Sequence, residues 1–145
     1  MKRLPIAGLV AGVAAACLIA GVMILTGAAR AEGDAPDGAT LTQGSWVLTS
    51  WSDSSDLPEA DITLNLEDGH IYGVSACNNY NGPVTIEGNS FQAGLMATTM
   101  MFCEDSADAE TTYLALLASV TEWNMDGDSL VLSADGAEIL RFATV

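Results

Sequence analysis

Apolar and polar residues alternate along much of the chain after residue 44, which is the period of half-buried β strands. The clearest stretches are residues 45–51 (SWVLTSW) and 62–66 (ITLNL). Dipeptides that suit tight two-residue hairpin turns follow at intervals: Asp68-Gly69, Gly88-Asn89, Asp126-Gly127 and Asp135-Gly136. Such dipeptides adopt positive φ angles at low cost. The pattern therefore predicts a chiefly antiparallel meander.

Residues 105–120 (DSADAETTYLALLASV) do not alternate and instead predict one helix. Acidic residues crowd the first turns, where they favour the positive end of the helix dipole, and Asp105 or Ser106 can cap it. Apolar residues fall at helical spacing: Tyr113, Leu116, Leu117 and Val120. We predict an α+β fold, mainly antiparallel β: a cracked or open β barrel with one amphipathic helix packed on it.

Residues 1–31 have the features of an export signal. Two basic residues, Lys2 and Arg3, precede an apolar run over residues 4–29, and small residues at Ala29 and Ala31 favour cleavage after Ala31. The run is also long enough for an uncleaved membrane anchor, which is the main competing interpretation. Lipid attachment at Cys17 is a weaker third, because the apolar run continues beyond it. We expect a periplasmic or extracellular domain, attached to a membrane only through this segment.

Residues 32–43 are small and polar and predict a flexible linker, so that residues 44–145 form one domain. All 19 acidic residues lie from Glu32 onward, and cleavage after Ala31 leaves Arg141 as the only basic residue, giving 1 minus 19, or −18. A surface of this charge repels nucleic acid. It is typical of a soluble, monomeric secreted domain.

The exported part offers little material for catalysis. His70 is its only imidazole and follows a predicted turn, so we expect it to be exposed. The exported part contains no lysine, and no pair of carboxylates is distinguished from the many others. We therefore predict a protein that is not an enzyme and that needs no metal or cofactor.

Four motifs in order resemble the META domain family. An opening strand carries Trp46 and Leu48. A CN-x-Y-x-G loop follows, then an Ala-Thr-x-x-M-x-C stretch, and last a helix with E-x-x-Y-L-x-x-L. The matching residues in these three are Cys77, Asn78, Tyr80, Gly82, Ala97, Thr98, Met101, Cys103, Glu110, Tyr113, Leu114 and Leu117. Two positions depart from the family pattern: Ala76 replaces a glycine, and no basic residue follows Thr99.

The resemblance implies a cracked antiparallel barrel with a helix, an envelope or secreted location, and no characteristic enzymatic activity. Heat-inducible envelope proteins are among the members. Cys77 and Cys103 occupy motif positions, and an even cysteine count in an oxidising compartment favours a disulfide between them. Two buried free thiols are the alternative.

Function at this point is a hypothesis with competitors. The first is a non-catalytic envelope or secreted protein that binds an envelope protein or a lipid-like ligand, in stress tolerance or envelope maintenance. Its candidate apolar pocket consists of Met96, Met100, Phe102 and Trp123, with Met101 nearby; core packing is the alternative role for these side chains. The second is a secreted protease or hydrolase inhibitor using loops 53–60 and 104–109. The third is an acid-dependent enzyme with two carboxylates.

Overall fold

The computed structural model describes residues 40–53 and 56–145. The predictions of a signal or anchor, of a lipid at Cys17 and of a linker over residues 32–39 lie outside this range. Within it, no helix has the length and apolar character needed to cross a membrane. Residues Ala31–Val145 form one compact unit, which contains the entire described core.

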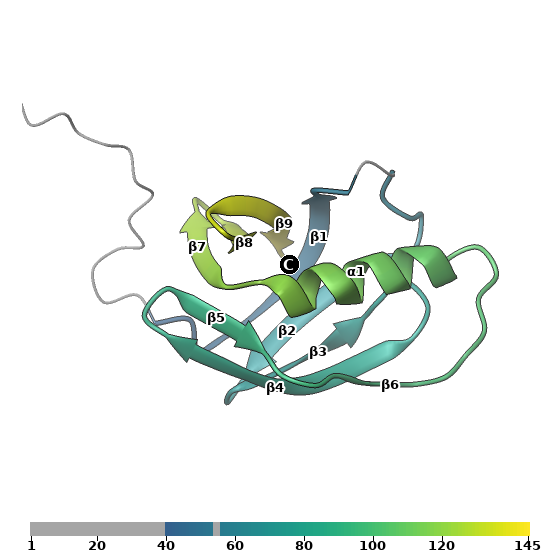
Figure 1. The fold of residues 1–145 in the computed structure, drawn as a ribbon, viewed down its shortest axis with the longest axis horizontal. Coiled ribbons are helices and arrows are strands. Elements are labelled where there is room, and N and C mark those ends of the chain that lie inside the picture. The colour runs from purple at the N-terminus through teal and green to yellow at the C-terminus, as the bar shows by residue number, and fades with distance from the viewer. Residues whose placement is uncertain (1–39, 54–55) are drawn as a thin grey trace, which may run out of the picture. The chain divides into compact units, whose positions relative to one another are not determined.

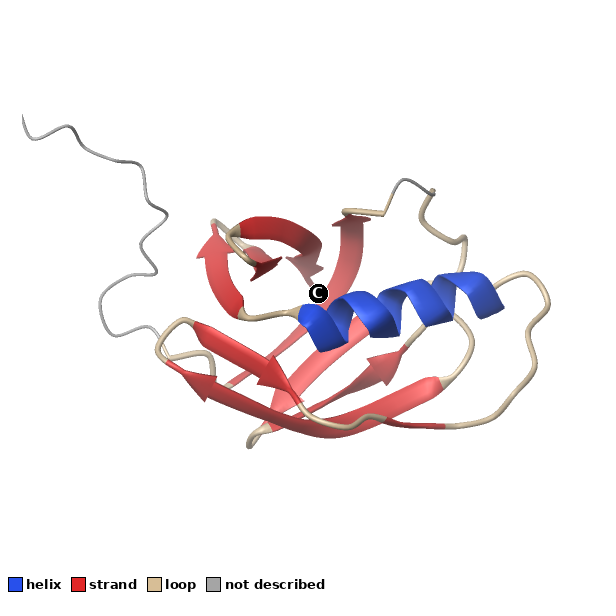
Figure 2. Ribbon diagram, in the orientation of Figure 1, coloured by secondary structure: helices blue, strands red, loops and turns tan. Residues whose placement is uncertain are grey.

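In the described residues, nine strands and one helix follow each other along the chain (Figures 1 and 2). They are β1 (Gln43–Trp51), β2 (Thr63–Glu67), β3 (His70–Val74), β4 (Asn79–Glu87), β5 (Ser90–Ala93), β6 (Ala97–Thr98), α1 (Ala107–Ser119), β7 (Glu122–Asp126), β8 (Ser129–Ala134) and β9 (Ala137–Thr144). The predicted linker ended at residue 43, but Gln43 already pairs with Glu67, and Leu41 packs against the core.

All strand pairs are antiparallel, in the order β3-β2-β1-β9-β8-β7-β5-β4-β6. A further pairing of β3 with β4 closes eight of the strands into a ring, and β6 pairs with Tyr80 and Asn81 of β4. The sparsest pairing is between β5 and β7, where Ser90 and Glu122 form a single register pair. The prediction of a mainly antiparallel sheet with one helix is confirmed. Figure 1 shows α1 lying across the sheet, between the side with β4 and β6 and the side with β7 to β9.

The hairpin turns lie where the sequence predicted them, with one shift. Asp68 and Gly69 both have positive φ, as do Asp135 and Gly136, which is the requirement of a type I′ turn. In the turn between β4 and β5, the first residue is Gly88, with φ 59°. Between β7 and β8, Asp126 pairs with Ser129, so the turn residues are Gly127 and Asp128 and not the predicted Asp126 and Gly127. Glycine takes the first central position there because that position has positive φ.

Helix α1 is shorter than the predicted 105–120. Ser106 occupies the N-cap position, as predicted, but its side chain makes no capping hydrogen bond. The reason is backbone geometry: Ser106 has φ −127° and ψ 3°, whereas a capping side chain is aimed by an extended backbone. At the other end, Val120 turns to ψ 135° and leaves the helix.

The core fills the ring and the space under α1. Trp46 from β1 is buried, as are Tyr113 and Leu117 from the helix and Trp123 from β7. Most of the remaining core side chains come from the alternating strands: Leu48, Leu64, Leu66, Ile71, Tyr80, Val84, Phe91, Leu130, Leu132, Ile139, Leu140 and Phe142. His70 is exposed at the start of β3, as predicted.

Candidate functional site

Asn78 fixes the segment that connects β5 to the helix. We call residues 95–102 of this segment the strap. The Asn78 side chain is buried, and its Oδ1 accepts hydrogen bonds from Met101 N (2.7 Å) and Thr99 Oγ1 (2.8 Å). Its Nδ2 donates to Met101 O (3.1 Å). One carboxamide therefore holds both backbone groups of Met101, in the way a neighbouring strand would.

The same asparagine binds the helix through Glu110. Asn78 N donates to Glu110 Oε2 (2.7 Å) and Asn78 Nδ2 donates to Glu110 Oε1 (2.9 Å). Ser75 Oγ lies 2.7 Å from Glu110 Oε2 and 2.9 Å from Asn78 O, and donates to either. We call Ser75, Asn78, Thr99 and Glu110 the polar corner. Its bonds join three segments that are far apart in the sequence.

The charge of Glu110 suits this arrangement. Desolvation acts to raise the pKa of the Glu110 carboxyl, but hydrogen bonds from the side chains of Asn78 and Ser75 and from the backbone of Asn78 and Cys77 outweigh it. The pKa of Glu110 is therefore below its ordinary value, and the carboxylate is the form that the corner stabilises.

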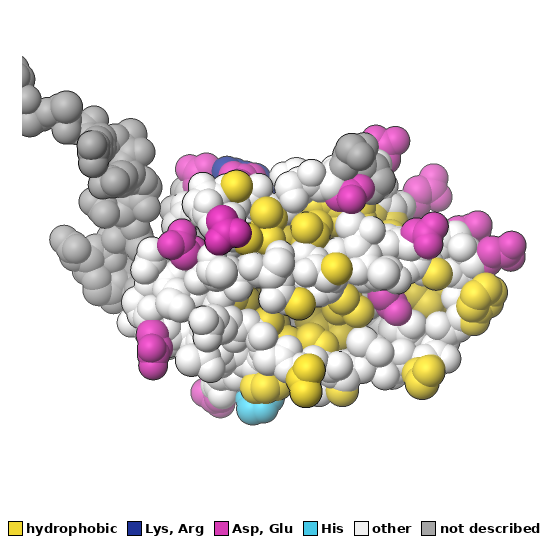
Figure 3. Space-filling model, viewed as in Figure 1, with side chains coloured by type: hydrophobic (Ala, Val, Ile, Leu, Met, Phe, Trp, Pro, Cys, Tyr) yellow, Lys and Arg dark blue, Asp and Glu magenta, His cyan; other side chains and the backbone are white. Residues whose placement is uncertain are grey.

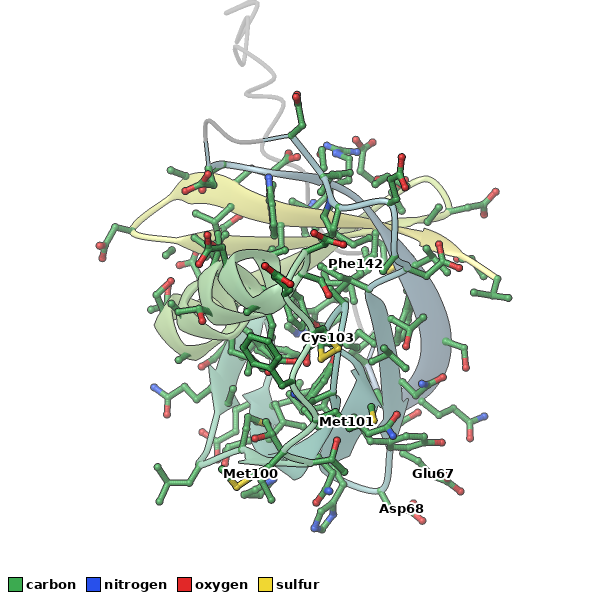
Figure 4. All side chains as sticks on the ribbon, turned by 90° about the vertical axis from the view of Figure 1, so that its right-hand side faces the viewer. Glu67, Asp68, Met100, Met101, Cys103 and Phe142 are labelled. Carbon is green, nitrogen blue, oxygen red and sulfur yellow. A yellow bond between two sulfur atoms is a disulfide. The ribbon has the colours of Figure 1, made fainter. Side chains whose placement is uncertain are left out.

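A disulfide between Cys77 and Cys103 closes the corner covalently, with the two Cα atoms 5.9 Å apart. The predicted pairing is confirmed. Cys77 directly precedes Asn78 and Cys103 directly follows the strap, so the strap is held at both Met101 and Cys103 (Figure 4).

A pair of buried tyrosines joins the helix to the sheet below the corner. Tyr80 Oη donates to Thr63 O (2.8 Å), so Tyr113 Oη donates to Tyr80 Oη (2.7 Å). Burial raises the pKa of both phenols, and proximity to Tyr80 raises the pKa of Tyr113 further. Both rings therefore stay neutral and serve as packing groups with satisfied hydroxyls.

The remaining motif residues position the strap. Ala97 and Thr98 are exposed and form β6, pairing with Asn81 and Tyr80. Gly82 lies under the strap, where a Cβ would approach both Leu95 O and Met96 Sδ to 2.7 Å. Glycine at this position lets the strap pass close to β4.

The candidate apolar pocket of the sequence analysis is divided by the fold. Trp123 is in the core and Met96 packs against it, whereas Met100 is 96% exposed and Phe102 is 85% exposed. Leu95 is 94% exposed and Met101 is 57% exposed. Figure 3 shows hydrophobic side chains projecting at the lower and right-hand edges, where Figure 1 places the chain from β6 to α1. The strap therefore presents its apolar side chains to the surface.

Ser75 and Thr99 are the corner residues that the sequence analysis missed. Ser75 is fully buried and stands in the approach to the cysteine, but a serine in a loop usually lies in solvent. The signal that could have found Thr99 is its place in the Ala-Thr-Thr run two residues before Met101. Ala76, the departure from the family pattern, has φ 80°, a conformation that glycine adopts more easily than alanine.

Comparison with known proteins agrees with this architecture. The model of the META domain family matches residues 39–145, which is most of the chain. This chain belongs to the META domain family. The match begins five residues before the predicted domain start at residue 44, in keeping with the packing of Leu41 against the core.

Two solved structures extend the comparison of the META fold. An NMR structure of a protein from Burkholderia xenovorans is 27% identical with a TM-score of 0.62, covering 81% of this chain and 96% of that one. A second NMR structure is 17% identical with a TM-score of 0.53, covering 70% of this chain and 88% of that one, and shows the fold alone. No curated protein matches the chain.

Proposed function

We propose that this META domain is an exported, non-catalytic binding domain that docks onto an envelope or secreted protein partner through its strap. The observation that carries the proposal is the exposure of Leu95, Met100 and Phe102 on a backbone fixed by Asn78 and by the disulfide. Apolar side chains gathered on a surface are typical of interaction sites. Of the seven large apolar side chains that are exposed in the described residues, four lie on the strap: Leu95, Met100, Met101 and Phe102.

The fixed backbone supports binding because it lowers the entropy lost on association. Met101 N and O are both bonded to Asn78, and Thr99 N donates to Asn79 O (3.0 Å). A strap that is already ordered loses little freedom when a partner covers it. Methionine side chains add adaptability, since they fit irregular apolar surfaces.

The acidic residues next to the strap indicate which kind of partner surface would bind it. Glu104, Asp105 and Asp108 are exposed where the strap enters α1. A matching surface has an apolar groove with basic residues at the rim, because opposite charges guide association and exclude wrong partners. An anionic membrane surface or nucleic acid meets repulsion from the same carboxylates.

Two finer interpretations belong to this proposal. We interpret the ring with its single-pair junction between β5 and β7 as an open barrel, which α1 covers. Export through residues 1–31 places the strap where an envelope or secreted partner meets it, and participation in stress tolerance or envelope maintenance follows from the family. Inhibition of a secreted protease or hydrolase through loops 53–60 and 104–109 stays the alternative prediction.

The test is site-specific photocrosslinking in the cells that produce the full chain. A photoreactive residue in place of Met100 should give one dominant protein adduct, and Phe102→Ser should reduce its yield about tenfold, because an exposed anchor of this size contributes about 1.4 kcal/mol. The matched control carries the same photoreactive residue in place of Thr111, which is exposed on α1. An adduct of equal yield from position 111, or one that persists in Phe102→Ser, would reject the strap as the docking surface.

A further inference from the structure

The outer face of β2, β3 and β4 carries an exposed tyrosine between two carboxamides. Tyr72 is 42% exposed and is directly opposite Asn65 on one neighbouring strand and Asn81 on the other. Directly opposite residues on adjacent strands place their side chains next to each other on one face. The three side chains therefore form a row across the sheet, with the aromatic ring in the middle.

Some polar groups of this row and of its neighbour Asn79 form hydrogen bonds within the protein, and others are free to bind a ligand. Asn65 Nδ2 donates to Tyr72 O (3.2 Å), which orients the Asn65 amide, and Tyr72 Oη donates to Glu67 Oε2 at 3.5 Å. Within the described residues, the carboxamides of Asn79 and Asn81 have no hydrogen-bond partner of their own. Each offers two donor hydrogens and a carbonyl acceptor to a ligand.

The row lies in a shallow hollow whose lining is uncharged. The hollow has a volume of about 390 Å³ and is lined by Thr63, Asn65, Tyr72, Gly73, Val74, Asn79, Tyr80 and Asn81. None of the 19 acidic residues of the chain and none of its basic residues is in this lining. On so acidic a domain, a neutral hollow provides neither the cations that hold an anionic ligand nor the carboxylates that hold a metal ion.

We propose that this face is a binding site for a neutral carbohydrate chain. An exposed aromatic ring packs against the C–H face of a sugar, while planar amides at both sides donate to and accept from its hydroxyl groups. Asn65 and Asn81 are two strand spacings apart, about 10 Å, which is roughly the length of two linked sugar rings. The hollow borders the strap, because Asn81 pairs with Ala97 of β6, but carbohydrate binding in the hollow does not need the protein partner.

The experiment titrates ¹⁵N-labelled residues 31–145 with two neutral probes, chitotetraose and cellotetraose, and follows the amide chemical shifts. This segment is one compact unit containing the whole described core. We expect millimolar or tighter binding of at least one probe, with the largest shifts at Asn65, Tyr72 and Asn81. Tyr72→Ala should weaken binding about tenfold, and Tyr72→Trp should retain it.

The matched control is Gln92→Ala, which removes an exposed carboxamide from β5 outside the row and should leave the affinity unchanged. Asn81→Ala should weaken binding, because it removes the amide on the far side of the ring. Thermal unfolding of each variant verifies that the fold is kept. The proposal is overturned if neither probe shifts the row, or if Tyr72→Ala binds as tightly as the unaltered domain. Neither result bears on crosslinking from the strap.

Discussion

The polar corner and the C-terminal hairpins β7–β8–β9 hold their segments together in different ways. In the hairpins, neighbouring strands are joined by turns of two residues, and the fully buried side chains of Leu130, Leu132, Leu140 and Phe142 face the core. In the corner, Asn78 and Ser75 bond Glu110 across 32 and 35 residues of sequence. One region depends on apolar burial between near neighbours, and the other on directed polar bonds between distant segments.

The polar corner fixes the backbone of the strap, although most of the strap is not part of a regular strand. The strap pairs as a strand over only two residues of β6, so a carboxamide, a carboxylate and a disulfide take the place of the ladder. Such bonds fix the backbone while leaving the side chains of Leu95, Met100 and Phe102 in solvent. An apolar core could not do this, since it would have to bury the same side chains.

The largest effect should come from removing apolar volume from the hairpin region. Phe142 is fully buried and packs edge-on against Tyr113, with ring centroids 6.4 Å apart. Phe142→Ala should lower the free energy of unfolding by about 4 kcal/mol, because the cavity adds to the lost burial. The matched change Phe102→Ala, on a ring 85% exposed, should alter it by about 0.5 kcal/mol or less. Urea unfolding measures both, and comparable losses would contradict the exposure of the strap.

The second-largest loss of stability should come from Asn78→Ala, which removes the central residue of the polar corner. The change leaves Met101 N and Glu110 without their Asn78 side-chain bonds, and we expect a loss of about 3 kcal/mol. Hydrogen exchange of the strap amides should accelerate, whereas amides of β8 and β9 should exchange only through global unfolding. Asn79→Ala, at the exposed neighbouring position, is the control. Unchanged protection of the strap would mean that the disulfide alone holds it.

Sequence patterns predicted the hairpin region well because its information is local. Alternation and glycine turns lie within a few residues of each other, and the one turn that shifted did so because Gly127, and not Asp126, has positive φ. The motif residues of the corner were recognised, but their roles were not, because a bond between Asn78 and Glu110 leaves no periodic trace. Ser75 and Thr99 escaped for the same reason.

Exposure of the strap was also beyond sequence reasoning. Apolar identity favours burial, so Met100, Phe102 and Trp123 were expected to act together, yet only Trp123 is in the core. Cys77 and Cys103 could be paired in advance because their number and their motif positions left few alternatives. The fold class could be predicted from local patterns, whereas the use of the surface depended on long-range bonds.

A smaller effect on stability should come from acid pH, which weakens the hydrogen bonds of Glu110 in the polar corner. The pKa of Glu110 is lower in the folded domain than in the unfolded chain, so its contribution is present above the unfolded pKa and is lost as pH falls through the folded pKa. Glu110→Gln should therefore cost about 1 kcal/mol at neutral pH, discounted for partial exposure, and less in acid. The free energy of unfolding of both proteins is measured by urea unfolding at each pH, and the difference between them reports the contribution of Glu110. The comparison repeated in an Asn78→Ala background should show a smaller pH dependence, and a difference that grew in acid would refute the assigned bonds.

The smallest effect on stability should come from replacing residues that have a left-handed backbone. Each region has one such residue that we compare. Ala76 in the corner has φ 80°, and Asp135 in the last hairpin turn has φ 51°. Alanine at positive φ costs about 1 kcal/mol, and glycine costs about 0.5 kcal/mol of extra chain entropy, so Ala76→Gly should raise stability by about 0.5 kcal/mol. Aspartate tolerates this conformation better, so Asp135→Gly should gain nothing. Thermal unfolding of the two variants side by side measures the difference. A loss of stability in Ala76→Gly would mean that the alanine methyl contributes packing at the corner that outweighs its backbone strain.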